Sequence, residues 1–326
     1  MTEINLVQAV NLALRRAMAD DARVLVLGED VGVDGGVFRA TEGLLEAYGE
    51  ERVIDTPLAE VGIAGVSIGL AVQDFRPVAE IQFTGFAYSC IDQLLNHASR
   101  LRARTRGRLT CPLVLRSPAG GGIRAIEHHS ESPEAMFAHI PGLKVVIPSS
   151  PARAYGLLLS AIRDPDPVVF LEPTRLYRAV REDVVDDGAG LPLGTCFTLR
   201  SGRDLTFVTW GAMVKETLEA AEGLSKDGIE VEVIDVATLK PLDSRTILDS
   251  VARTGRLVIV HEAPLTGGFG AEIAARVASA GLTDLIAPIE RVAGYDTMMP
   301  YPRLEAWYTP SVNRIIAAAR RVMAYQ

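Results

Sequence analysis

The feature that most constrains the fold is an alternation of short apolar runs with longer amphipathic segments. Apolar runs such as RVLVLG and PVVFLE alternate with segments of helical periodicity. In residues 5–19, for example, Leu6, Val10, Leu14 and Met18 are four residues apart. Strands that alternate with helices of this kind are typical of largely parallel sheets. The pattern therefore predicts an α/β fold.

The alternation is interrupted near residue 180 and then resumes, which predicts two domains. The interrupting stretch VREDVVDDGAGLPLGT is acidic and loop-like. A chain of 326 residues is about twice the length of a typical domain. We expect a first domain over residues 1–185, a linker over 186–200 and a second α/β domain over 201–326.

Charge and hydropathy exclude several function classes. The 33 basic and 41 acidic side chains give a net charge of −8, which argues against a nucleic-acid partner. The longest apolar stretch, residues 61–72, is shorter than the ~20 residues of a membrane span. The first residues include Glu3 and show neither the basic cluster nor the small-residue cleavage site of a signal peptide. We expect a cytoplasmic protein with no membrane partner.

Two short motifs suggest other enzyme classes. Gly65, Ser67 and Gly69 match the G-x-S-x-G turn of serine hydrolases, but they lie inside residues 60–72, which we interpret as a buried helix. Close helix packing explains such glycines better. Residues 120–125 fit G-x-G-x-x-A, yet the polar EHHSE that follows is no pyrophosphate-binding helix. A serine hydrolase, an NAD oxidoreductase and a non-catalytic scaffold remain alternatives.

A glutamate and a pair of adjacent histidines are candidate catalytic residues. Glu60 precedes twelve uncharged residues, so we expect it at the edge of a dry core, where burial raises a carboxyl pKa. His128 and His129 have side chains that titrate near neutrality, but they lack the H-E-x-x-H spacing of a helical zinc site. From the residues alone, each histidine could be either a solvated surface residue or part of a functional site.

Several long motifs, in one order, together resemble a known family. They are GEDVG (28–32), GGVFRATEGL (35–44), RVIDTPLAEVGIAG (52–65), EIQF…F…DQ (80–93), HHSESPEAMF (128–137), GLKVVIPS (142–149), DPVVFLEP (166–173), LKPLD (239–243) and VHEAPLTGGFGAEIA (260–274). Over nearly its whole length the chain resembles the β subunit of the thiamine-diphosphate-dependent decarboxylating component of 2-oxo acid dehydrogenase complexes. The resemblance implies a transketolase-like pyrimidine-binding domain followed by a transketolase C-terminal-like domain.

The resemblance implies roles for residues of the first domain. Glu60 corresponds to the glutamate that hydrogen-bonds the aminopyrimidine ring of thiamine diphosphate, which favours the tautomer that activates the thiazolium ring. Phe86 corresponds to the aromatic residue that stacks on that ring. Glu29, Leu58 and Gln82 correspond to residues that line the same pocket.

The second catalytic residue implied is His129, which corresponds to the histidine of the family's H-S-Q-S motif. That histidine faces the 2-oxo acid and the incoming lipoyl group. Glu131 replaces the glutamine of the motif here, so we expect a raised pKa for His129.

Metal sites are implied in two places. Some family members hold a structural potassium ion at positions that correspond to Leu113, Ala161, Ile162, Asp164 and Asp166. The Gly-Asp-Gly segment that holds magnesium and the cofactor's diphosphate elsewhere in the superfamily is absent from this sequence. We therefore expect an α subunit to hold magnesium.

The expected assembly is an α2β2 heterotetramer with a lipoyl-bearing acyltransferase core as partner. The helix after Glu60 would be a packing face between subunits, and the arginines between residues 100 and 108 could lie there too. The implied reaction is oxidative decarboxylation of a small-molecule 2-oxo acid, followed by acyl transfer to the lipoyl group. The GYDT sequence at residues 294–297 resembles branched-chain members, so we expect a branched-chain substrate, with pyruvate and acetoin as alternatives.

Overall fold

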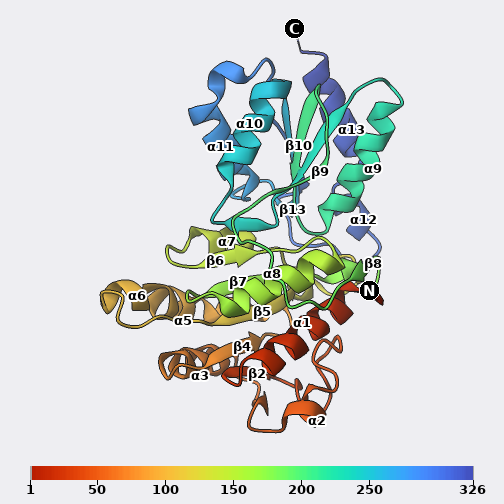
Figure 1. Ribbon diagram of the computed structural model, residues 1–326. Coiled ribbons are helices and arrows are strands. Elements are labelled where there is room, and N and C mark those ends of the chain that lie inside the picture. The colour runs from red at the N-terminus through yellow and green to blue at the C-terminus, as the bar shows by residue number, and fades with distance from the viewer. Residues whose placement is uncertain (1, 326) are drawn as a thin grey trace.

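Two α/β domains, each built on one main sheet, make up the computed structural model, which describes residues 2–325 (Figure 1). The sheet of the first domain has seven strands in the order β12-β6-β7-β5-β4-β2-β3. Six of them are parallel, as the alternating pattern predicted: β2 (Val24–Gly28), β3 (Val53–Asp55), β4 (Arg76–Glu80), β5 (Val114–Ala119), β6 (Lys144–Val146) and β7 (Val168–Pro173).

Helices cover both faces of this sheet. The helices α1 (Leu6–Asp20) and α8 (Pro151–Arg163) pack together on one face. Asn5 and Gln8 form a capping box at the start of α1, and Ser150 caps α8. The other face carries α3 (Glu60–Val72) and α5 (Ile91–Asn96). Shorter helices are α2 (Leu44–Tyr48), α4 (Thr84–Ala87), α6 (Leu101–Arg104) and α7 (Glu134–His139).

The second domain has a five-stranded sheet in the order β14-β13-β10-β11-β9. Its strands are β9 (Phe197–Arg200), β10 (Leu205–Thr209), β11 (Val231–Asp235), β13 (Leu257–Pro264) and β14 (Glu290–Gly294), and only β9 is antiparallel. The helices α9 (Met213–Ser225) and α13 (Val312–Met323) lie on one face. The other face carries α10 (Ser244–Thr254) and α11 (Gly270–Ala280) (Figure 1).

A strand from the second half of the chain joins the sheet of the first domain. The alternating apolar pattern of residues 229–239 predicts one strand, but β11 ends at Asp235 and the backbone turns at Ala237, whose φ is +49°. The residues beyond this turn form β12 (Thr238–Lys240), which pairs antiparallel with β6. One hydrophobic cluster also contains residues of both domains, for example Leu115 and Ile234. The two domains are therefore packed as one unit.

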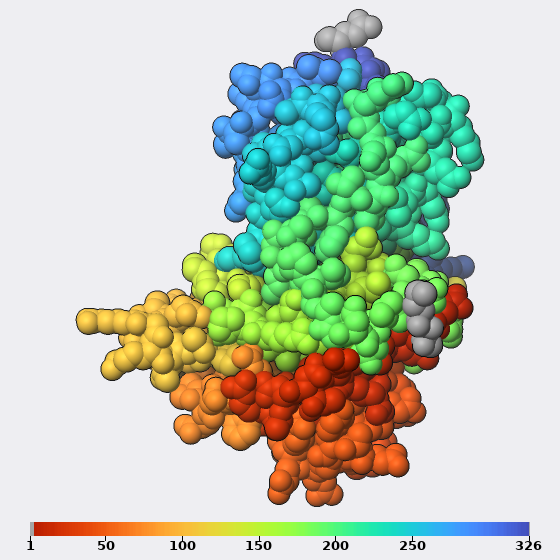
Figure 2. Space-filling view, viewed as in Figure 1, coloured from red at the N-terminus to blue at the C-terminus, as the bar shows by residue number. Residues whose placement is uncertain are grey.

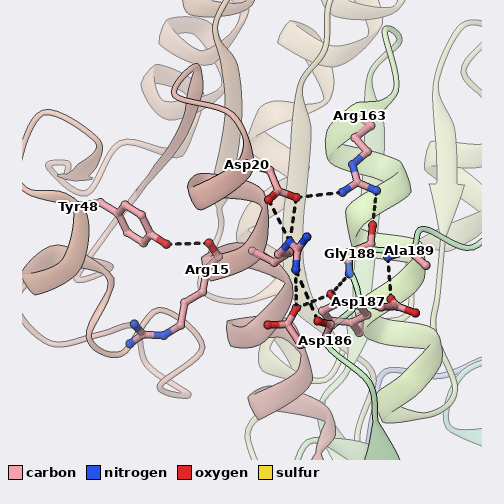
Figure 3. A network of polar contacts seen from close by, with 10 residues as sticks. Arg15, Asp20, Tyr48, Arg163, Asp186, Asp187, Gly188 and Ala189 are labelled. Carbon is pink, nitrogen blue, oxygen red and sulfur yellow. Dashed lines mark hydrogen bonds and ion pairs between the residues drawn. The ribbon is translucent and has the colours of Figure 1, made fainter. Parts of the chain in front are cut away.

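The stretch that follows the first domain is held against α1 and α8 (Figure 3). Arg163 donates to the carbonyl oxygen of Gly188 at 2.8 Å and pairs with Asp20 at 3.5 Å. Tyr155 donates to Asp186 at 2.6 Å and accepts the Gly188 N–H. Before this stretch, β8 (Arg181–Val184) pairs with β1 (Thr2–Asn5). Residues 197–200, placed in the expected linker, form β9.

The helix α3 is less buried than the sequence suggested. Its bounds are those expected, and Ile63, Ala64, Ser67 and Ala71 face the core. Its outward face is also apolar, however, and leaves Val61 46% and Val66 58% exposed. The expectation of a buried helix is wrong for the single chain, because no described element covers this face.

The rest of the surface has two further features. The segment around α5 and α6 projects from the side of the first domain (Figure 2). Within residues 2–325, no helix combines the length and the apolar character needed to cross a membrane.

Candidate cofactor and active site

The predicted site residues lie on loops that leave the carboxyl ends of neighbouring parallel strands. Ligands of open α/β sheets bind in the crevice outside these strand ends. Glu29 follows β2, Leu58 and Glu60 follow β3, Gln82 and Phe86 follow β4, and His129 lies on the loop after β5. The strand order places β3, β2, β4 and β5 side by side, so all four loops emerge along one edge of the sheet.

An aromatic cluster joins the loops after β4 and β5. The ring centroids of Phe86 and His129 are 5.4 Å apart, and those of Phe83 and His129 are 4.0 Å apart. A Cβ atom on Gly85 would lie 2.0 Å from the carbonyl oxygen of His128, so only glycine fits there. The structure thus brings the two predicted residues Phe86 and His129 together. Phe83 lies in the EIQF motif, but the sequence analysis assigned it no role.

Carboxyl groups gather at the ends of β2 and β3. Glu29 is 7% exposed, and its pKa is raised by burial and also by the negative charges of Glu60 and Asp30. Glu60 is half-buried at the first turn of α3, where its carbonyl oxygen accepts the Cys90 thiol at 3.3 Å. Gln82 donates to Asp30 at 2.8 Å, which links the loops after β2 and β4. Asp30 was missed because nothing in its local sequence indicated this contact.

Four buried polar atoms around this edge have no hydrogen-bond partner in the described part of the chain. They are Glu29 Oε1, Thr56 Oγ1, His129 Nδ1 and Ser130 Oγ. A buried polar atom without a partner costs about 1–3 kcal/mol, so these atoms are candidates to bond a polar ligand. An aminopyrimidine ring, which carries donors and acceptors on an aromatic plane, fits these atoms and the adjacent Phe86.

The pKa of His129 is lowered, not raised. Burial is the main cause, the neighbouring His128 adds to it, and Glu127 partly opposes it. The expected effect of Glu131 is wrong because its carboxylate is used elsewhere. Glu131 Oε2 accepts the Tyr88 hydroxyl at 2.9 Å. The lowered pKa favours the neutral imidazole of His129.

A buried ion network lies within the sheet, beneath the site loops. Arg116 on β5 is fully buried and makes two hydrogen bonds of 2.7 Å to Glu172 on β7. It also donates to Glu80 at the end of β4. The Tyr177 hydroxyl donates to Glu172 at 2.5 Å. This network fixes three neighbouring strands close to the point where the site loops begin.

The residues of the expected potassium site already have partners. The carbonyl oxygens of Leu113, Ala161 and Ile162 accept N–H groups of Val168, Asp164 and Arg76, respectively. Asp164 pairs with Lys144, and Asp166 pairs with Arg102 at 2.7 Å. Because cations of the chain neutralise both carboxylates, this donor set fits a potassium ion poorly. Among residues 2–325 there is no group of three or more His, Cys, Asp or Glu side chains that could hold a metal.

The two short motifs of other enzyme classes lack the geometry that those classes need. Ser67 is fully buried inside α3, and its hydroxyl donates to the carbonyl oxygen of Ile63 at 2.7 Å. A serine nucleophile must instead be exposed at a strand-to-helix turn. The Gly120–Gly122 turn leads into a loop with only the short helix η3 (Glu127–His129). That turn offers no long helix N-terminus to a pyrophosphate group.

Comparison with known proteins defines the class of the chain. Residues 2–180 match the pyrimidine-binding domain of transketolase, and residues 194–315 match the transketolase C-terminal domain. A solved structure described as a split gene transketolase, inactive β4 tetramer, shares the fold with a TM-score of 0.82. The match covers 99% of each chain at 23% sequence identity. The predicted α/β fold with two transketolase-like domains is confirmed.

Relatives of the same length narrow the class to a family. The pyruvate dehydrogenase E1 component subunit beta of Bacillus subtilis strain 168 is 48% identical over 325 residues, which is 100% of both chains. The proteins of the same name from Staphylococcus aureus strain Mu50 and Staphylococcus epidermidis are 47% identical over the same length. The chain belongs to the family of β subunits of the decarboxylating E1 component of 2-oxo acid dehydrogenase complexes, which confirms the resemblance seen in its motifs. Membership of this family implies dependence on thiamine diphosphate.

Proposed function

We propose that this chain, joined to an α subunit, catalyses the oxidative decarboxylation of a 2-oxo acid and passes the acyl group to a lipoyl-bearing acyltransferase. The observation that carries the proposal is the set of buried polar atoms without partners at the same sheet edge as the aromatic cluster of Phe83, Phe86 and His129. They lie where parallel α/β sheets bind ligands.

The first-domain residues have separate tasks in this proposal. Glu60 hydrogen-bonds the aminopyrimidine ring, Phe86 stacks on it, and Glu29, Leu58 and Gln82 line its pocket. When bound, thiamine diphosphate supplies the electron sink that decarboxylation needs. Leu58 is 80% exposed in the single chain and can cover the ring once a ligand or a partner is in place. The raised pKa of Glu29 makes its carboxyl readier to share a proton than an exposed glutamate.

His129 acts on the acid and lipoyl side of the site. With its lowered pKa, the neutral imidazole can accept a proton or a hydrogen bond at pH 7. Its contact with Phe83 fixes the orientation of the ring. We propose that it helps transfer the acyl group to the lipoyl sulfur.

The α subunit completes the site and holds magnesium in the proposed α2β2 assembly. The exposed apolar face of α3 supports this part of the proposal. Val61 and Val66 point outward, and a Cβ atom added at Gly69 would meet nothing within 4 Å. Large apolar side chains and open glycines on one helix face suit close packing against another helix.

We propose pyruvate as the substrate. The relatives that are 47–48% identical over the full length carry pyruvate dehydrogenase names. The GYDT residues that suggested a branched-chain acid lie in and after β14 of the second domain, where Asp296 accepts the Thr266 hydroxyl. Tyr295 is 54% exposed there. No described contact links these residues to His129, so the branched-chain acid becomes the second candidate.

The test uses the chain co-expressed with an α subunit and supplied with thiamine diphosphate and magnesium. Carbon dioxide release is followed with an artificial electron acceptor, and pyruvate is compared with 3-methyl-2-oxobutanoate and acetoin. The proposal predicts turnover with a preference for pyruvate. A preference for the branched acid would restore the expectation from the sequence. No turnover by a verified tetramer with bound cofactor would contradict the proposed function.

A further inference from the structure

The loop that carries His128 and His129 leaves β5 at a turn that the second domain holds. The Gly121 N–H donates to Glu262 Oε1 at 2.6 Å, and the Gly122 N–H donates to Glu305 Oε1. Glu262 lies on β13, and Glu305 is the first residue of α12 (Glu305–Tyr308). Two carboxylates from separate elements of the second domain therefore bind consecutive backbone N–H groups of the first domain.

The other end of the same loop also contacts the second domain. Glu134, which begins α7, accepts the indole N–H of Trp210 at 3.2 Å. Trp210 follows β10 and stacks on His261 with centroids 5.2 Å apart and planes 7° apart. Between the two ends, the Gly120 N–H donates to the carbonyl oxygen of Glu131 at 2.8 Å and closes the base of the loop.

Neighbouring side chains occupy the Cβ positions of both glycines at the first end. A Cβ atom on Gly121 would lie 2.6 Å from the terminal methyl carbon of Met299. Gly122 has a φ of +93°, and a Cβ atom there would lie 2.4 Å from the side chain of Arg175. Arg175 is itself fixed by a two-point ion pair with Glu216 on α9. A side chain at Gly121 or Gly122 would therefore displace Met299 or Arg175 of the present packing.

We propose that Glu262 and Glu305 are positioning residues, through which the second domain sets the orientation of the His129 loop. Among the described residues, their carboxylates accept hydrogen bonds only from the backbone N–H groups of Gly121 and Gly122, so they act through the loop. The inference rests on the proposed function in assigning His129 to acyl transfer. Misplacing a reacting group by about 1 Å can lower a rate by up to about 100-fold. We therefore expect a loosened loop to lower the rate of acyl transfer.

The test compares alanine and glutamine variants in the co-expressed complex. Glu262→Ala and Glu305→Ala remove the acceptor, whereas Glu262→Gln and Glu305→Gln keep an amide oxygen that still accepts the N–H. Glu290→Ala, which breaks a surface ion pair with Arg321 in the same domain, is the matched control. We expect the alanine variants to lower the lipoamide-dependent rate roughly 10- to 100-fold and the artificial-acceptor rate far less. The glutamine variants should recover most of this loss.

A second measurement does not depend on activity. Hydrogen exchange in peptides spanning residues 120–131 of the full chain should be faster in both alanine variants and unchanged in Glu290→Ala. This result would support the positioning contacts even if the complex decarboxylated none of the acids tested. Unchanged hydrogen exchange in the alanine variants would overturn the inference. An equal loss of the lipoamide-dependent and artificial-acceptor rates would also overturn it. So would glutamine variants that are as impaired as the alanine variants.

Discussion

The ring of Phe83 lies against the imidazole of His129, with centroids 4.0 Å apart and an interplanar angle of 53°. This contact joins the loop after β4, which carries the predicted cofactor-stacking residue, to the loop after β5, which carries the predicted acyl-transfer residue. It also helps to bury His129, and burial is the main cause of its lowered pKa. One aromatic pair therefore affects both the position and the charge of this histidine.

Replacing His129 should separate acyl transfer from cofactor binding. In His129→Ala we expect lipoamide reduction to fall about 100-fold, because a positioned acid–base group contributes at least that much. The dissociation constant of thiamine diphosphate should change little, since Glu60 and Phe86 remain. Stopped-flow acyl transfer and calorimetric titration of the complex measure the two quantities, with exposed His97→Ala as control. Weakened cofactor binding with normal lipoamide reduction would reverse the assignment.

The exposed apolar face of α3 should be needed for assembly and not for folding. Val66 is 58% exposed, so Val66→Asp should change the free energy of unfolding of the single chain by no more than about 0.5 kcal/mol. The same change should prevent assembly with the α subunit, as measured by light scattering. Leu282→Asp is the control, because Leu282 is a 64% exposed apolar residue of the second domain. A normal heterotetramer formed by Val66→Asp would place the interface elsewhere.

Removing Arg116 should destabilise the first domain strongly. Its loss leaves the carboxylates of Glu80 and Glu172 buried without a cation, which costs about 3–5 kcal/mol. Arg116→Met should therefore lower the urea midpoint far more than Arg321→Met, which breaks a surface pair with Glu290 worth at most about 1 kcal/mol. If both variants lowered the urea midpoint by the same small amount, the buried network would contribute little to stability.

The stability of the chain should depend on pH through Glu134. Burial raises its pKa from 4.5 to about 7. The folded state therefore holds this proton more tightly than the unfolded state, so the stabilisation is complete below pH 4.5 and is lost as the pH rises through 7. The difference between the pKa of Glu134 in the folded and unfolded states corresponds to roughly 3 kcal/mol in the free energy of unfolding.

Glu134→Gln removes this titration and keeps an oxygen that can accept the Trp210 N–H. The melting temperature of the variant should approach that of the wild type at pH 5 and exceed it at pH 8. Thermal unfolding at the two pH values measures the difference. If the melting temperatures of the variant and the wild type differed by the same amount at both pH values, the raised pKa of Glu134 would be contradicted.

Local sequence signals predicted most elements of the fold. The uncharged run after Glu60 gave the bounds of α3, and helical spacing indicated α1. The sequence of residues 88–103 is typical of one helix, but the structure has several short helices there. The backbone leaves the helical region at His97, with φ −122° and ψ −69°, and separates α5 from α6. β12 was missed because its partner β6 is distant in the sequence, and local propensity carries no information about that pairing.

Family motifs carried the prediction of the proposed site residues, whose roles stay predictions. The structure brings the loops of Glu29, Glu60, Phe86 and His129 to one edge of the sheet. Contacts that depend on tertiary structure could not be read from the sequence. Glu262 and Glu305, for example, reach Gly121 and Gly122 across 141 and 183 residues of chain. The direction of the His129 pKa was also mispredicted, because it depends on where the Glu131 carboxylate points.

Glu60 carries the proposed activation of the cofactor, and Glu60→Gln in the co-expressed complex tests this role most directly. The measurement is carbon dioxide release from pyruvate with an artificial electron acceptor, after light scattering has verified the heterotetramer. Glu60 is half-buried at a helix N-terminus, so the variant should fold and assemble. We expect the rate of carbon dioxide release to fall at least about 100-fold in Glu60→Gln and to stay unchanged in Glu290→Gln. Wild-type turnover by Glu60→Gln would contradict the proposed site.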